Sequence, residues 1–159
     1  MPLKINMHLS AGPVFAQKSV MKYAIAFLLC LFSWQLFAQA DHRIDVTVSN
    51  IESTKGQLII SLFDTETNFL EKPYKTMTVP ATKGSVSASF EGIPAGTYAI
   101  AVIHDKNENA ELDTNFMGIP KERYGWSNNP SPSFRAARWD EALFSVKAGS
   151  SSQFTIKLL

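Results

Sequence analysis

The chain has 159 residues, a single cysteine and a formal net charge of +1, from 15 basic and 14 acidic side chains. This balance excludes the basic footprint of a nucleic-acid-binding protein, and one cysteine excludes an internal disulfide framework. The cysteine, Cys30, lies in an apolar N-terminal stretch, so the 119 residues after position 40 contain none. They suffice for one domain whose stability comes from its core.

The N-terminus carries the three parts of a secretory signal peptide. Lys22 supplies the basic flank, residues 23–37 are largely apolar, and Ala38-Gln39-Ala40 is a small-residue cleavage site. We therefore expect residues 21–40 to be a signal peptide that is cleaved after its last alanine, and the mature protein to be periplasmic or secreted. Residues 1–20 fit no part of the signal and are interpreted as a mis-called or dispensable extension. An uncleaved N-terminal anchor is the alternative.

The mature part, 41–159, has the hydrophobic pattern of short β-strands. Apolar and polar residues alternate over 44–48 and 85–90, as in strands with one buried face. Apolar residues are more continuous over 57–63 and 97–103, which indicates central strands. Further strands are expected at 74–79, 141–146 and 153–158.

About seven strands, separated by Gly, Pro and Asn turns, predict an all-β domain. We expect a single antiparallel β-sandwich of the transthyretin-like or immunoglobulin-like kind, with one long structured loop. A turn near 67–72 is the only helix-like signal, and the last two strands are expected to pair with each other. The side chains predicted inside are Val46, Ile60, Phe90, Ile100, Val102, Phe144 and Ile156.

A polar, glycine- and aromatic-rich segment of about thirty residues, 104–134, interrupts the strand pattern. Structureless loops longer than about 12–15 residues are uncommon in compact domains and are usually functional or disordered. The many aromatic residues argue against disorder. We therefore expect the functional site in this segment.

Oxygen-bearing side chains occupy every second position at the start of the segment: Asp105, Asn107, Asn109, Glu111 and Asp113. The first three match the first three ligand positions of a calcium loop, and we predict that all five converge on one calcium ion. Two positions depart from that loop type, because Ala110 replaces the turn glycine and Phe116 replaces the bidentate glutamate. The alternative is a turn whose Asp and Asn side chains bond their own backbone.

Three residues near the end of the segment, Tyr124, Trp126 and Asn128, are predicted to be exposed contacts for a ligand. Aromatic rings offer a large contact area, and exported sandwiches bind through loops, so a sugar ring or a loop of an envelope protein is the expected partner. In the alternative, the aromatic residues form a satellite core that fixes the segment on the sandwich. That set comprises Phe116, Tyr124, Trp126, Phe134 and Trp139.

His104, Asp105 and Glu122 supply the residue types of a hydrolase. No G-x-S-x-G or H-E-x-x-H motif accompanies them. We therefore predict a non-catalytic binding or accessory module, and a hydrolase that uses His104 with Asp105 or Glu122 is the alternative. The exposure of His104 discriminates between them, since a general base must reach a pocket.

Two groups of residues carry a resemblance to known families. FEGIPAGTY at 90–98 resembles the hairpin of many transthyretin-like and carboxypeptidase-regulatory-like sandwiches. HDKNEN at 104–109, GIPKE at 118–122 and SNN at 127–129 resemble the exported bacterial proteins grouped as domain of unknown function 2141. This second resemblance covers essentially the whole mature chain and departs at Ala110, where glycine is expected. It implies an exported sandwich of Gram-negative bacteria and brings no established activity.

Export gives a direct test of the N-terminal interpretation. We expect envelope-fractionated protein to begin at Asp41, because cleavage follows an A-x-A site. N-terminal sequencing checks this, and a cytoplasmic product that retains Met1 would contradict it.

Overall fold

A computed structural model describes residues 42–133, 135–147 and 151–159, which form eight strands and one short helix. The elements are β1 (His42–Ile51), β2 (Gln57–Phe63), β3 (Lys75–Pro80), β4 (Gly84–Ile93), β5 (Gly96–Asp105), β6 (Tyr124–Trp126), α2 (Trp139–Ala142), β7 (Phe144–Val146) and β8 (Ser152–Lys157). The predicted signal peptide, Cys30 and Phe134 lie outside the described residues.

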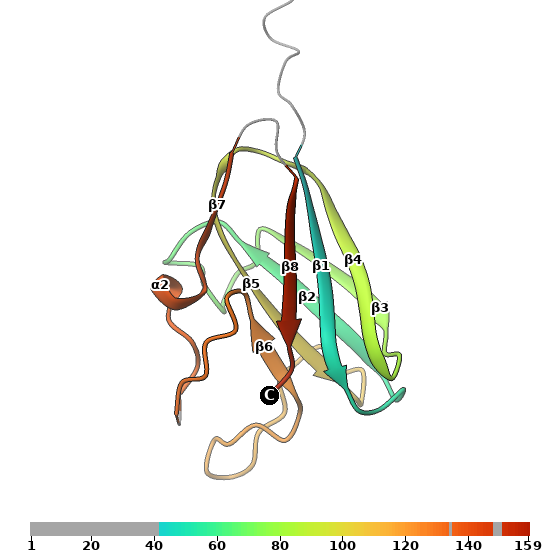
Figure 1. The fold of residues 1–159 in the computed structure, drawn as a ribbon. Helices are drawn as coiled ribbons and strands as arrows, with labels where there is room; N and C mark the ends of the chain where they lie inside the picture. The colour runs from blue at the N-terminus through green and yellow to red at the C-terminus, as the bar shows by residue number, and fades with distance from the viewer. Residues whose placement is uncertain (1–41, 134, 148–150) are drawn as a thin grey trace, which may run out of the picture. The chain divides into compact units, whose positions relative to one another are not determined.

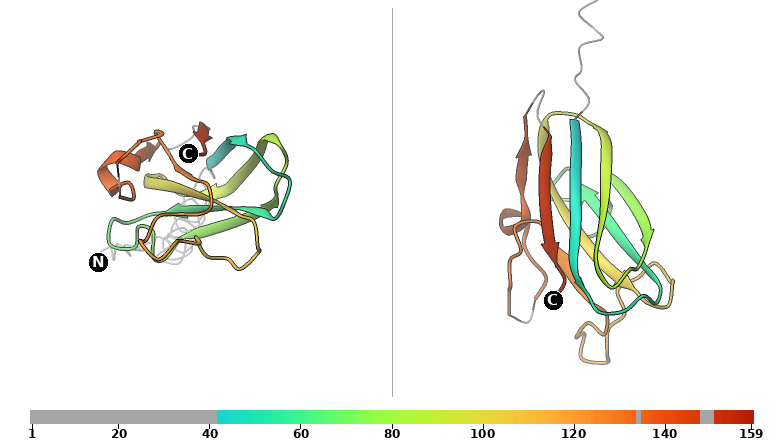
Figure 2. Two further views of the ribbon diagram at one scale, coloured as in Figure 1. Left: turned by 90° about the horizontal axis from the view of Figure 1, so that it is seen from below. Right: turned by 45° about the vertical axis from the view of Figure 1, so that its right-hand side comes forward.

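The strands form two sheets that pack as the layers of a sandwich (Figures 1 and 2). One sheet has the order β4-β1-β8; the other has the order β3-β2-β5-β6, with β7 also paired to β5. The pairing is antiparallel except between β1 and β8, which run parallel. The predicted all-β sandwich is confirmed, and the parallel pair is a feature that alternation within each strand could not reveal.

The core lies between the two sheets, because every second side chain of a strand points to the same face of its sheet. Ile44 and Val46 of β1 belong to the same buried cluster as Ile60 of β2 and Ile100 of β5, and all four are fully buried. Each of the seven side chains predicted inside is at most 9% exposed, so the predicted core is confirmed. No helix in the described ranges is long and apolar enough to cross a membrane.

The C-terminal part differs from the prediction in its pairing. The strand predicted at 141–146 is shorter, because Trp139–Ala142 form helix α2, which has Asp140 and Glu141 in its first turn. Carboxylates are favourable there because they face the positive end of the helix. The prediction that the last two strands pair with each other was wrong: β7 pairs with β5, and β8 pairs with β1.

Two glycines allow backbones to approach where the long segment meets the sandwich. Gly56 has a φ of +75°, and a Cβ atom there would lie 2.1 Å from the carbonyl oxygen of Asp105. A Cβ atom on Gly125 in β6 would lie 2.9 Å from both the Cγ2 atom of Ile156 and the carbonyl oxygen of Lys157. A larger residue at either position would displace the neighbouring backbone or a core side chain. Glycine at these positions therefore allows the start and the end of the loop to pack closely against neighbouring strands and turns.

Truncation of one central core side chain tests this packing. We expect Ile100→Ala to lower the free energy of unfolding by about 2–5 kcal/mol, because it leaves a cavity between the sheets. Urea denaturation measures the change. Thr78→Ala, on the exposed side of edge strand β3, is the matched control and should change it by less than about 0.5 kcal/mol. Equal effects of the two substitutions would contradict the assignment of the core.

Candidate functional site

The described part of the long segment, 104–133, is built as a succession of closed turns on the end of β5. Its first part, 106–123, leaves β5 and returns as β6, which pairs with β5 through Ala101–Trp126 and Ile103–Tyr124. The backbone N–H of His104 donates to the carbonyl oxygen of Arg123 (2.8 Å), which brings the two ends of this loop together. The strand β6 was missed from the sequence, because three residues of alternation are too short to distinguish from a loop.

Asp105 organises the first turn of the loop. Its carboxylate accepts hydrogen bonds from the backbone N–H groups of Asn109 (3.2 Å) and Ala110 (2.9 Å) and from the side-chain amide of Gln57 (3.0 Å). Burial alone would raise the pKa of Asp105, but hydrogen bonds from Gln57 and from the backbone of residues 108–110 outweigh it and lower the pKa below its ordinary value. Asp105 is therefore an anion at neutral pH whose role in this fold is to hold the turn.

The two Asn side chains and Asp113 close the turn from the other side. The amide nitrogens of Asn107 and Asn109 donate to the two carboxylate oxygens of Asp113, at 2.7 and 3.2 Å. The amide oxygen of Asn107 accepts from the backbone N–H of Asn109, and the amide oxygen of Asn109 accepts from the backbone N–H of Glu111. These last two hydrogen bonds are side-chain-to-backbone turns of the kind that the sequence offered as the alternative to a metal site.

The carboxylate of Glu122 spans the base of the same loop. It is 7% exposed and accepts the backbone N–H groups of Lys106 (2.7 Å) and Asp113 (3.2 Å), one on each carboxylate oxygen. Glu122 thus ties the start of the loop at Lys106 to its returning part at Asp113, and sequence reasoning missed this role. The GIPKE sequence at 118–122 includes Glu122, but it does not indicate which groups Glu122 bonds.

The five predicted metal residues are only partly brought together. Asp105, Asn107, Asn109 and Asp113 are linked by hydrogen bonds, whereas the carboxylate of Glu111 makes no hydrogen bond or ion pair with the described residues. Within the described residues, no three His, Cys, Asp or Glu side chains are grouped closely enough to hold a metal ion. Any cation here would therefore depend on amide and backbone oxygens as much as on carboxylates. Ala110 has a φ of +63°, so alanine takes the left-handed conformation that normally favours glycine.

Residues 114–120 form a hydrogen-bonded tip that exposes apolar side chains. The amide oxygen of Asn115 accepts the backbone N–H groups of Met117 (2.9 Å) and Ile119 (3.0 Å), and Thr114 bridges to Pro120. The tip presents apolar side chains to solvent: Phe116 is 97% exposed and Met117 is 68% exposed. Phe116 therefore lies outside the satellite core that the sequence suggested for it.

A pocket of about 900 Å³ lies between this tip and the outer face of the second sheet. Its wall includes Met117, Ile119 and Leu112 of the loop, Tyr124 and Trp126 of β6, and residues from two distant parts of the chain, Leu70 and the pair Arg135-Ala136. The wall is mostly apolar, as is usual for pockets that bind small molecules, and the volume falls in their common range. Sequence reasoning could not find this pocket, because its wall joins residues as far apart as 70 and 136.

Trp126 lies in a second core on the outer face of the sheet rather than at the surface. It is 5% exposed and packs with Phe63, Ala101 and Ala142, and its ring centroid lies 4.9 Å from that of Tyr124. The prediction of an exposed Trp126 contact was wrong, because alternation along β6 turns this ring onto the sheet. Tyr124 is half-buried, and both Tyr124 and Trp126 form part of the pocket wall.

The tripeptide Ser127-Asn128-Asn129 joins three elements that follow the long loop. The buried hydroxyl of Ser127 accepts from the backbone N–H of Ile100 in β5 (3.0 Å) and donates to the carbonyl oxygen of Ala142 at the end of α2. The side-chain amide of Asn129 donates to the carbonyl oxygen of Thr155 (2.8 Å) and accepts from the N–H of Lys157 (2.7 Å), both in β8.

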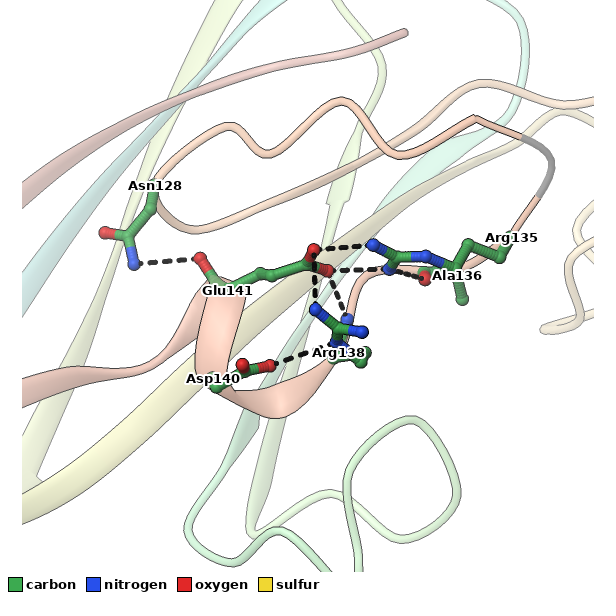
Figure 3. A network of polar contacts seen from close by, with 6 residues as sticks. All are labelled: Asn128, Arg135, Ala136, Arg138, Asp140 and Glu141. Carbon is green, nitrogen blue, oxygen red and sulfur yellow. Dashed lines mark hydrogen bonds and ion pairs between the residues drawn. The ribbon is translucent and has the colours of Figure 1, made fainter.

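Asn128, predicted as a ligand contact, is exposed, but its amide nitrogen is used within the fold. It donates to the carbonyl oxygens of Glu141 (3.2 Å) and Leu143 (2.9 Å), the first of which is drawn in Figure 3. Asn128 and Asn129 both have positive φ values, 64° and 51°, which asparagine tolerates better than most residues. Asn128 lies outside the set of residues that line the pocket.

Arg135 and Glu141 form a charged network beside the pocket (Figure 3). The guanidinium of Arg135 donates to both carboxylate oxygens of Glu141, at 2.7 and 2.6 Å, and the backbone N–H of Arg138 donates to the same carboxylate (2.8 Å). The Arg135 hydrogen bond, followed by that from Arg138, lowers the pKa of Glu141 to about 2. Glu141 therefore stays ionised above that pH, and its charge balances that of Arg135.

His104 has the environment of a structural anchor. It is completely buried, its Nε2 atom lies 2.9 Å from the carbonyl oxygen of Lys55, and its Nδ1 atom has no partner in the part of the chain described. Its side chain points into the sandwich, whereas the alternating geometry of β5 turns Asp105 to the opposite face. Asp105 and Glu122 bond backbone N–H groups, so the arrangement lacks the open acid–base pair that the hydrolase alternative needs.

Comparison with known families gives one match. The family model described as an uncharacterised protein conserved in bacteria (DUF2141) matches residues 46–154, which span β1 to β8 and include the whole of the long segment. No curated protein and no solved structure matches the chain.

Proposed function

The chain belongs to the bacterial DUF2141 family of uncharacterised proteins, and we propose that it is a non-catalytic binding module of the cell envelope. Its ligand occupies the pocket between the 114–120 tip and the second sheet. The observation that carries this proposal is the pocket itself, a mostly apolar hollow of about 900 Å³. The envelope location rests on the signal sequence at residues 21–40.

Exposed apolar side chains support the same site. Six large hydrophobic side chains among the described residues are exposed, and three of these, Leu70, Met117 and Ile119, line the pocket. Contiguous exposed apolar surface marks sites of interaction, because a soluble protein otherwise avoids it. The tip that carries two of these side chains is held by Asn115, so the surface is formed before any ligand binds.

The burial of His104 favours a binding role over a hydrolytic one. A general base must reach the proton it abstracts at about 2.6–3.2 Å, directly or through one water molecule. The imidazole of His104 faces the interior of the sandwich, and the pocket lies on the other face of β5 and β6. A hydrolase that uses His104 would therefore need the sandwich to open.

A neutral fluorescent dye tests the pocket. We expect Nile red to bind the protein with saturable fluorescence enhancement and Ile119→Asp to weaken that binding at least tenfold, because the substitution places a carboxylate in the apolar wall. Leu159→Asp is the matched control, because Leu159 is 44% exposed, against 50% for Ile119, and lies off the pocket. Equal binding by the wild type and both variants, or no saturable binding, would contradict the site.

We also infer that one calcium ion can hold the 105–113 turn. Four oxygen-bearing side chains, those of Asp105, Asn107, Asn109 and Asp113, already form one hydrogen-bonded group. Rotation of the carboxamide of Asn107 or Asn109 would turn its oxygen, in place of its nitrogen, toward the carboxylate of Asp113. Calcium accepts such mixed sets of carboxylate, amide and backbone oxygens.

Calcium binding has a thermodynamic signature. We expect calcium at a hundredfold excess over its dissociation constant to stabilise the protein by about 2.7 kcal/mol, because the ion binds only the folded turn. Asp113→Asn should remove this gain, and Glu108→Gln, at an exposed acid of the same turn, should keep it. Thermal melts with calcium and with EDTA give the measurement. A wild-type melting temperature that is the same in both would end the calcium proposal and leave the binding pocket unaffected.

A further inference from the structure

We propose that the ligand of the pocket is an organic cation with an apolar body, whose charge pairs with Glu111. This inference rests on the proposed function, because it assumes that the pocket binds a ligand, and it adds the chemical class. The apolar body follows from the lining already described, in which Leu70, Met117, Ile119 and Trp126 leave few polar contacts.

The sign of the ligand charge follows from the two charged residues that line the pocket, Glu111 and Arg135. Arg135 makes two hydrogen bonds to the Glu141 carboxylate and a third, from Nη1, to the carbonyl oxygen of Ala136 (2.9 Å). The positive charge of Arg135 is thus balanced by Glu141, which lies outside the pocket wall and stays ionised at physiological pH. An anionic ligand would have to displace this bidentate pair.

Glu111 is the charge in the wall that remains unbalanced. Its side chain is exposed and makes no ion pair or hydrogen bond with any residue that the structure describes. Its backbone N–H is fixed by the amide oxygen of Asn109 at 2.9 Å, so the carboxylate is attached to an ordered position at the edge of the pocket. A cation there gains an ion pair without breaking an existing one.

A sugar is a poorer fit to the same wall. Recognition of a neutral sugar requires several side chains with free hydrogen-bonding groups, because each hydroxyl removed from water must find a partner. Within this wall, the guanidinium of Arg135 is already used by Glu141. The lining that remains suits an aliphatic or aromatic body.

Three amphiphiles with the same chain test the proposal: decyltrimethylammonium, decyl glucoside and decyl sulfate. Each is titrated into the purified mature protein below its micelle-forming concentration, and binding is followed by tryptophan fluorescence and two-dimensional amide NMR. We expect the cation to bind about two- to fivefold more tightly than the neutral glucoside, the range of a partly solvated ion pair, and the sulfate to bind most weakly. The preference should decrease as salt is added.

Glu111→Gln is the decisive variant, since it removes the charge and keeps the shape. We expect it to bind the cation no more tightly than the glucoside, whereas Glu108→Gln keeps the wild-type preference. The inference is overturned if the sulfate binds as tightly as the cation, or if Glu111→Gln keeps the cation preference. If none of the three amphiphiles binds at the pocket, the proposed function itself fails, which is a different result from binding without charge preference.

Discussion

The hydroxyl group of Ser127 connects the parts of this fold that carry the candidate site. It is completely buried and bonds the backbone of β5 on one side and the end of α2 on the other. A buried backbone group that loses its partner costs about 1–3 kcal/mol, so each bond constrains where the chain can run after β6. Asn128 then bonds Leu143, the residue before β7, and Asn129 bonds β8; β7 and β8 lie in different sheets.

These hydrogen bonds explain how the long segment stays ordered although it lies outside the core between the sheets. The loop before Ser127 closes on itself through the carboxylates of Asp105 and Glu122, which accept its backbone N–H groups. The chain after Ser127 is held by the ion pair between Arg135 and Glu141. Residues of both parts line the pocket, together with Trp126 and Tyr124. The proposed binding site is thus a hollow whose walls are held by polar contacts outside it.

Much of the fold could be predicted from the sequence because strand alternation is a local signal. Gln57–Phe63 was predicted with its observed bounds, and Val46, Ile100 and Ile156 are buried as expected. Pairing was less predictable, because nothing in Phe144–Val146 or Ser152–Lys157 indicates which sheet each strand joins. Helix α2 was hidden by its length of four residues.

The candidate site was predictable in place but not in detail. Its location followed from the length and composition of segment 104–134, and the Asx turns followed from the spacing of Asp105, Asn107 and Asn109. The contacts of Ser127 and Asn129 join residues 15 to 28 positions apart, and such pairs leave no local pattern. The burial of Trp126 could not be predicted for the same reason, because it depends on which strands and side chains pack beside β6.

The most direct test of the role of Ser127 is the free energy of unfolding of Ser127→Ala, measured by urea denaturation beside Ser145→Ala, an exposed serine of β7. We expect a loss of at least about 2 kcal/mol for Ser127→Ala, because two buried backbone groups lose their partner, and less than about 0.5 kcal/mol for the control. Native-state hydrogen exchange should place the effect at the Ile100 amide, which donates to Ser127. A Ser127→Ala protein as stable as the control, with an equally protected Ile100 amide, would contradict the central role given to this hydroxyl.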